Sequence, residues 1–245
     1  MKSDIPLYIL AEKKELPECQ FMDFQTLEWI EKNRPNFDDN GLVKINPSKI
    51  VDYYIKRYTP KINWFENESI VSTIHGQRHL LRCVALAGIL CEANLFSANV
   101  DELCILASLH DIKRKNDKED SGHAERASLW LRDNFGMISN VYGYEMNNEI
   151  IEKISQAILY HDQKEYPEFL DTSLISLIEN FKVVDALDRY RQPKIKWWIN
   201  EDFLKLKISS SIKRIAFDLV LKSERYFLSG LSNEESVSKA IYDIL

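Results

Sequence analysis

The chain has 245 residues, of which 45% are hydrophobic, and a formal net charge of −6 at pH 7. A chain of this length and composition can enclose a sizeable hydrophobic core. The acidic balance argues against extended nucleic acid as a partner, because phosphate neutralisation requires clustered Lys and Arg. Small phosphorylated ligands need only a few cations, so the net charge does not exclude them.

The sequence also lacks the patterns that place a protein in a membrane or direct it to secretion. No stretch approaches the roughly 18 consecutive apolar residues of a membrane span, and the opening MKSDIPLYIL is not built like a signal peptide. We therefore predict a cytoplasmic protein without a membrane partner. The four cysteines have no CxxC spacing, which favours packing roles for Cys19, Cys83, Cys91 and Cys104.

Hydrophobic periodicity predicts an all-α fold. Apolar residues recur at i, i+3, i+4 and i+7 in most windows, and no pair of strands is evident. In chain order, the predicted helices are 24–33, 47–58, 80–90, 99–112, 120–134, 147–161, 173–189, 202–229 and 233–245. Asn99, Asp120 or Ser121, Asn147 and Ser173 are the expected N-terminal caps, and Gly230 is the expected stop between the last two helices.

Four of these helices each carry one metal-capable side chain on an apolar stripe, namely His79, His110, His161 and Asp185. A single histidine in such a position is usually a core residue. An inward carboxylate is costly to bury unless it is paired or binds a metal. A salt bridge between Asp185 and Arg189 is one explanation. The clustering of all five histidines between 75 and 161 favours a shared metal site instead.

Two other kinds of site fit poorly. HGQRH has the histidine spacing of a zinc-protease helix, but Gly76 stands where that motif needs a glutamate. His79 can still be a ligand, and His75 is then expected at the helix start as a cap or cavity residue. Nucleophilic catalysis lacks support, because there is no GxSxG and no cysteine in an evident electropositive setting.

The ordered motifs HGQRHLLRC, ASLHDIKRKND, ILYHD and VVDALDRYR resemble the HD-domain superfamily of metal-dependent phosphohydrolases. The resemblance covers about residues 70–192. It implies an HD-domain helical core over 66–195, with an N-terminal helical extension (1–65) packed on it and C-terminal helices (196–245) completing the same domain. The HxxR start of the family falls on His79 and Arg82, the HD pair on His110 and Asp111, and the closing aspartate on Asp185.

The same resemblance implies a ligand set for one or two divalent ions. His79, His110, Asp111 and Asp185 would hold the first ion, with His123 and His161 as candidates for a second. Mixed His and carboxylate ligation suits Mn, Fe, Co, Ni or Zn.

The implied activity is hydrolysis of a phosphoester, in a nucleotide or another small phosphorylated metabolite, by metal-activated water. Asp111 or Asp117 would accept the proton. Family members commonly bind phosphate with a basic residue three positions after the HD aspartate, which is Arg114 here. The remaining expected substrate contacts are Lys113, His75, Arg189 and His123.

Two alternatives stay open at this point. If His123 and His161 both join the site, the four histidines and two aspartates resemble HD-type mixed-valence di-iron oxygenases, although the basic loop and the short spacing from Asp111 to His123 favour phosphate chemistry. The other alternative is a non-catalytic HD module that binds a nucleotide or a partner.

Trp197 and Trp198 are adjacent, so at most one of them can point straight into a core.

Overall fold

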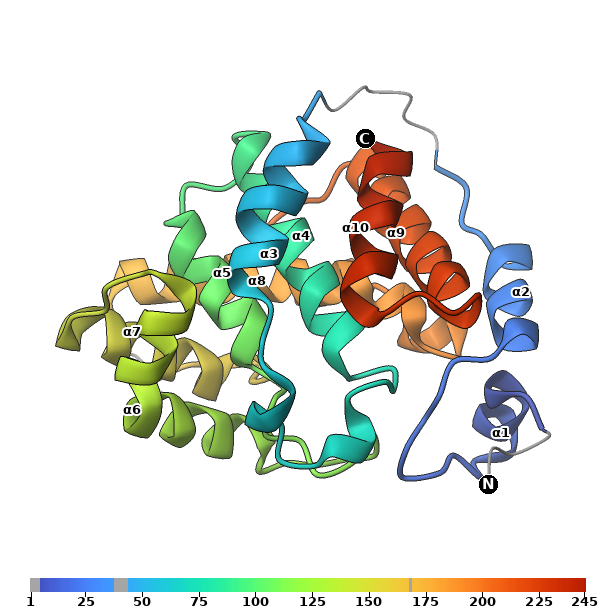
Figure 1. The fold of residues 1–245 in the computed structure, drawn as a ribbon, viewed down its shortest axis with the longest axis horizontal. Helices are drawn as coiled ribbons and strands as arrows, with labels where there is room; N and C mark the ends of the chain where they lie inside the picture. The colour runs from blue at the N-terminus through green and yellow to red at the C-terminus, as the bar shows by residue number, and fades with distance from the viewer. Residues whose placement is uncertain (1–4, 38–43, 168) are drawn as a thin grey trace.

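The computed structural model describes residues 5–37, 44–167 and 169–245, and every regular element in this part of the chain is a helix (Figure 1). The all-α prediction is confirmed. The α-helices are α1 (Leu7–Lys13), α2 (Phe24–Lys32), α3 (Lys56–Tyr58), α4 (Gln77–Glu92), α5 (Val100–Leu109), α6 (His123–Tyr142), α7 (Asn148–Tyr160), α8 (Thr172–Asp188), α9 (Ser210–Leu228) and α10 (Asn233–Ile244). A π-helix, η1 (Lys49–Ile55), leads into α3. The 3-10 turns are η2 (Ile62–Trp64), η3 (Glu68–Ile70), η4 (Arg189–Arg191), η5 (Ile195–Trp197) and η6 (Glu201–Phe203).

Helix α4 is the centre of the fold. All its residues from Gln77 to Leu90 are buried, as expected for a helix that is covered on every side. Figure 1 shows α4 between α5 on one side and α9 and α10 on the other. The π-helix η1 also packs on it at Gly88, where an added Cβ would lie 2.6 Å from the Tyr54 ring.

The remaining helices surround this centre. Helices α6 and α7 pack on each other, and α7 and α8 both contact α5. At the opposite side of Figure 1, α2 lies against α9 and α1 against α2. One hydrophobic cluster runs through the described residues, from Leu7 in α1 to Ile241 in α10. None of the described helices has the length and apolar character needed to cross a membrane.

A buried ionic network ties three of these helices together. Arg82 on α4 donates to Asp188 on α8 at 2.5 Å and to Glu224 on α9 at 2.6 Å, and Arg78 donates to Glu224 at 2.8 Å. All four side chains are fully buried. Each charge therefore depends on its partners, because an unpaired buried charge is very costly.

Several helix ends lie where local chemistry predicts them. The side chain of Asn99 accepts from the N–H groups of Asp101 and Glu102 at the start of α5, and that of Asn147 accepts from Ile150 in α7. Gly230, with φ of 104°, separates α9 from α10 as predicted. A left-handed residue at this place terminates a helix without the steric cost that a side chain would add.

Other ends differ from prediction. Helix α6 begins at His123 rather than at 120 or 121, because the Asp120 carboxylate accepts from the Lys115 N–H and from Arg126 instead of capping. The helix also continues past Asn134 to Tyr142, since buried Ile138 and Tyr142 extend its apolar stripe.

The helix predicted for 99–112 stops at Leu109, with His110 as its C-cap. Asp171, not Ser173, caps α8, and Ser209 caps α9, so that 202–209, which was predicted to be helical, precedes the helix. Helix α1 has no counterpart in the sequence prediction.

Candidate metal centre

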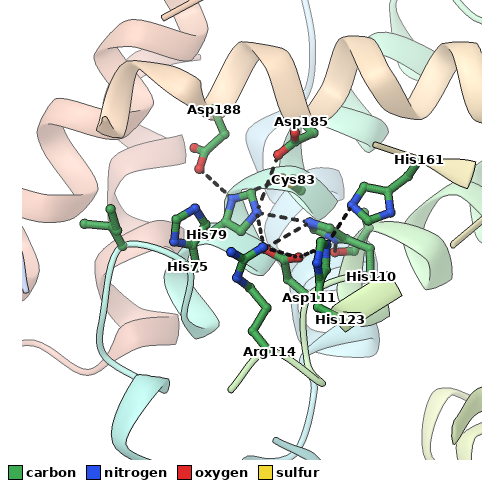
Figure 2. A network of polar contacts seen from close by, with 12 residues as sticks. His75, His79, Cys83, His110, Asp111, Arg114, His123, His161, Asp185 and Asp188 are labelled. Carbon is green, nitrogen blue, oxygen red and sulfur yellow. Dashed lines mark hydrogen bonds and ion pairs between the residues drawn. The ribbon is translucent and has the colours of Figure 1, made fainter. Parts of the chain in front are cut away.

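Six predicted ligands converge from separate parts of the chain (Figure 2). They are His79 on α4, His110 and Asp111 at the end of α5, His123 at the start of α6, His161 just after α7, and Asp185 on α8. Helix ends supply most of them, so side chains that are distant in sequence meet where the ends of several helices come together. Apart from Asp185, whose side chain is 28% exposed, each of these residues is buried.

The first group of donor atoms surrounds the Nε2 atom of His79. This nitrogen lies 3.1 Å from His110 Nε2, 3.6 Å from Asp185 Oδ1 and 3.7 Å from Asp111 Oδ2. The second group lies on the other side of Asp111. His123 Nε2 is 3.2 Å from Asp111 Oδ1 and 3.4 Å from His161 Nε2. Asp111 thus presents one carboxylate oxygen to each group.

All four histidines have the same hydrogen-bonding pattern at Nδ1. His79 Nδ1 lies 2.8 Å from Asp188 Oδ2, while His110, His123 and His161 Nδ1 lie 3.0, 2.6 and 2.7 Å from backbone carbonyl oxygens. Carbonyl and carboxylate oxygens only accept, so each Nδ1 carries the proton. In the neutral tautomer, every Nε2 then has a lone pair, and these nitrogens approach each other in two pairs, His79 with His110 and His123 with His161.

This arrangement of nitrogen lone pairs suits a cation. Two nitrogen lone pairs facing each other at 3.1 Å repel, and a metal ion between them satisfies both. His79, His110 and Asp111 have donor atoms close enough to hold one ion, and Asp111, His123 and His161 to hold another. Asp111 belongs to both groups, and His79, His110, His123 and His161 are the imidazoles that would hold an ion with it.

Protonation states agree with metal binding, which needs neutral imidazoles and ionised carboxylates. Burial lowers the pKa of His79 well below its usual range, and burial lowers that of His110 to about 4. Burial alone would raise the pKa of Asp185, but His79, Arg191 and His110 bring it down to about 2. Burial also opposes ionisation of Asp111, yet Arg114 and the surrounding histidines hold its pKa well below the usual range.

Asp188 is a positioning residue that the sequence analysis did not single out. It accepts from His79 Nδ1 and from Arg82, which fixes the tautomer and the orientation of the His79 ring. Figure 2 shows Asp185 and Asp188 reaching from one helix to opposite sides of this ring. Their i, i+3 spacing is the signal that would have identified Asp188, because residues three apart share a helix face.

Cys83 is a poor ligand despite its position. Its sulfur lies 3.5 Å from His79 Nδ1, the nitrogen that already donates to Asp188. Burial, with Asp188 and Asp185, raises the pKa of the thiol well above its usual range, so the thiolate that binds metals is disfavoured. The packing role predicted for this cysteine is consistent with these surroundings.

The candidate centre opens into a cavity of about 1110 Å³. Of the predicted substrate contacts, those that line it are His75, Arg114, His123 and Arg189. Lys113 does not line it. Its ammonium lies 3.7 Å from Glu66 and over the Trp130 ring, so the structure places this predicted phosphate contact outside the cavity walls.

Asp117, predicted as an alternative proton acceptor, lines the cavity and also forms several structural hydrogen bonds. Its carboxylate accepts from the Gln20 N–H at 2.6 Å and the Thr73 hydroxyl at 2.8 Å, and it lies 3.1 Å from His75 Nδ1. These contacts join the N-terminal segment to the loop before α4. Asp117 therefore orients His75 at the wall of the cavity, and of the two predicted proton acceptors Asp111 is the one within the centre itself.

Two arginines after α8 behave differently from expectation. Arg189 donates through Nε to the Trp197 carbonyl at 2.7 Å, and this contact replaces the salt bridge to Asp185 considered from the sequence. Arg191, which the sequence analysis missed, is 3% exposed and also lines the cavity. Its Nη2 lies 3.5 Å from His79 Nε2, and its buried Nη1 forms an ion pair with Asp188 Oδ2 at 3.3 Å.

Comparisons with models of known protein families, with curated proteins and with solved structures return no match for this chain. The resemblance to HD proteins thus rests on the motif residues alone.

Proposed function

We propose that this protein is a metal-dependent phosphohydrolase of the HD superfamily, acting on a nucleotide or another small phosphorylated metabolite. The observation that carries the proposal is the centre around Asp111, where four Nε2 atoms and two carboxylates converge beside a cavity lined with arginines. Mixed His and carboxylate ligands suit Mn, Fe, Co, Ni or Zn.

When bound, divalent ions would supply an activated water and a Lewis acid for the phosphoryl oxygens. The chain's own residues prepare the site for that chemistry. Asp188 holds His79 in the required tautomer, and the carbonyl acceptors do the same for the other three rings. Asp111, ionised and central, faces both ligand groups with its two oxygens, as a carboxylate ligand requires.

Charge around the cavity supports an anionic substrate. Seven basic and seven acidic side chains line the walls, and two of the acidic ones are the ligands Asp111 and Asp185. Two divalent ions would therefore make the balance clearly positive. Arg114 Nη1 lies 3.5 Å from Asp111 Oδ1 and Arg191 Nη2 lies 3.5 Å from His79 Nε2, so the two guanidinium groups flank the ligand groups, where they would stabilise charge on phosphoryl oxygens.

The geometry also favours a second candidate, the di-iron oxygenase. His123 and His161 lie with Asp111, so the short spacing from Asp111 to His123 does not keep His123 away. The ligand set alone does not separate the two reactions. The basic residues around the cavity favour phosphate, and oxygen-dependent turnover with two irons per chain would favour the oxygenase.

Phosphate release from a panel of nucleotides, measured with each metal recovered from chelator-free protein, tests the proposal. Asp111→Ala should abolish release while its far-UV circular dichroism stays that of the wild type. Asp133→Ala is the control, because this aspartate is exposed on α6 and does not line the cavity. Retained turnover in Asp111→Ala would refute the assignment. Metal binding without turnover of any substrate would favour the non-catalytic module.

A further inference from the structure

A second cavity, of about 540 Å³, adjoins the one over the metal centre. Its walls come from the end of α1, the loop after Asn116 and the segment that follows η4. The residues that line both cavities are Asp117, Glu119, Gln192, Lys196 and Trp197. Because the two cavities share these walls, a ligand held at the metal centre could extend into the second cavity.

Four lysines line the second cavity, namely Lys14, Lys118, Lys194 and Lys196. None of them forms an ion pair with any residue that the structure describes, although Lys194 donates to the Ala11 carbonyl. The acidic residues of the same walls are Asp117, already committed to Gln20, Thr73 and His75, and exposed Glu119. The cavity therefore has a surplus of uncommitted positive charge, which favours an anion.

Trp197 lies where the two cavities meet. Its neighbour Trp198 takes the core position, 6% exposed and packed edge-on against Trp29, Tyr190 and Phe217. Trp197 is consequently directed to the other side, half-buried in the shared wall, with the Lys194 ammonium 5.1 Å from its ring centre. A large aromatic ring beside cationic side chains suits stacking with a planar ring such as a nucleobase.

We infer that the substrate spans both cavities, as an aromatic phosphoester with a second anionic group distant from the phosphate at the metal centre. The second anion binds among the four lysines, and the aromatic ring stacks on Trp197. This inference rests on the proposed function for the place of the first phosphate. The anion site among the lysines is a separate feature and can be tested by binding alone.

Isothermal titration calorimetry of the metal-loaded full chain tests it, with a nucleoside 3′,5′-bisphosphate and the matching 5′-monophosphate as probes. The bisphosphate should bind about tenfold more tightly, as expected for two or more partly exposed charge contacts. In Lys14→Ala/Lys118→Ala this ratio should fall to near one. The control Lys13→Ala/Lys115→Ala changes two exposed lysines next to these, neither of which lines a cavity, and should keep the wild-type ratio.

Equal affinity of the wild type for the two probes would overturn the inference. An equally large fall of the affinity ratio in the control double variant would also overturn it, because it would indicate unspecific electrostatic attraction. If no nucleotide is hydrolysed but the affinity ratio follows the lysines, the anion site stands and the proposed reaction fails. If nucleotides are hydrolysed but the bisphosphate and the monophosphate bind with equal affinity, the reaction stands and the second subsite is refuted.

Trp197 provides an independent arm of the experiment. Trp197→Ala should weaken nucleotide binding about tenfold and leave the affinity for inorganic pyrophosphate, which has no ring, unchanged. Trp197→Phe preserves an aromatic surface and should recover most of the affinity. Equal weakening of both ligands in Trp197→Ala would contradict stacking and indicate a general disturbance of the cavity wall.

Discussion

At the scale of single residues, one hydrogen-bonding pattern repeats four times. Each ligand histidine has its Nδ1 beside a protein oxygen, and each turns Nε2 toward Asp111. Backbone carbonyls serve three of the rings and Asp188 serves the fourth, His79. A carboxylate partner makes a ligand imidazole more basic and fixes its direction, so His79 depends on one side chain in a way that the other histidines do not.

Asp188→Asn should therefore weaken metal binding about 10- to 100-fold, because the amide cannot support the ring and its charge as the carboxylate does. Competition with a chromophoric chelator measures the affinity. Glu224→Gln is the control, since it disturbs the same ionic network without touching His79. Unchanged metal affinity in Asp188→Asn would contradict the positioning role.

The sequence identifies candidate ligands better than it identifies the residues around them. Helical spacing together with the HD resemblance picks out His79, His110 and Asp185, because an apolar stripe determines which way a short side chain points. Lys113 and Arg191 are long and flexible, and their direction depends on tertiary partners such as Glu66 and the Ile74 carbonyl. No local pattern encodes those partners, so the roles of such residues could not be predicted.

At the scale of helices, the ionic network of α4, α8 and α9 sets the position of the centre. Arg82 holds Asp188, Asp188 holds His79, and Glu224 anchors both Arg78 and Arg82. Burial would raise the pKa of Glu224, but Arg78 and Arg82 lower it below its usual value. The three helices are thus coupled through charges that are costly to leave unpaired.

Glu224→Ala should lower the free energy of unfolding by about 3–5 kcal/mol, because it leaves two buried guanidinium groups undercompensated. Urea denaturation measures the change. Glu31→Ala is the matched control, since it removes the half-exposed pair with Arg225 on the same helix and should cost less than about 1 kcal/mol. Similar losses of unfolding free energy in both variants would contradict the larger contribution of the buried network.

Helix existence follows from periodicity, whereas helix ends depend on contacts that the local sequence does not contain. Aspartate is a common N-cap residue, but the Asp120 carboxylate accepts hydrogen bonds from Arg126 and from the Lys115 N–H. Helix α6 therefore starts at His123. The stretch 202–209 continues an apparent helical pattern, yet Ser209 is the residue that caps α9. In both cases a competing hydrogen bond or cap, not the apolar pattern, decides the boundary.

At the scale of the whole molecule, the buried centre makes stability depend on pH. The pKa of His110 falls from about 6.5 to about 4 on folding, and that of Asp185 from 3.8 to about 2. In both cases the unfolded chain binds the proton first as the pH falls. Acid therefore shifts the equilibrium toward the unfolded state.

For the metal-free protein, the free energy of unfolding should consequently decrease as the pH is lowered from about 6.5 to 4, through His110, and further from 3.8 toward 2, through Asp185. Urea titrations at a series of pH values measure this. His110→Gln cannot titrate and should show a shallower decrease between pH 6.5 and 4. A stability that is flat or rises over this interval in the wild type would contradict the neutral, buried state of the centre.

The proposal on which the rest depends is that the two ligand groups sharing Asp111 would each hold a metal ion, and metal content per chain tests it most directly. Protein purified without chelator and saturated with each metal should hold two ions in the wild type and one in His161→Ala. His75→Ala, which changes the one histidine outside the ligand set, should keep two. At most one ion in the wild type, or two in His161→Ala, would contradict the account.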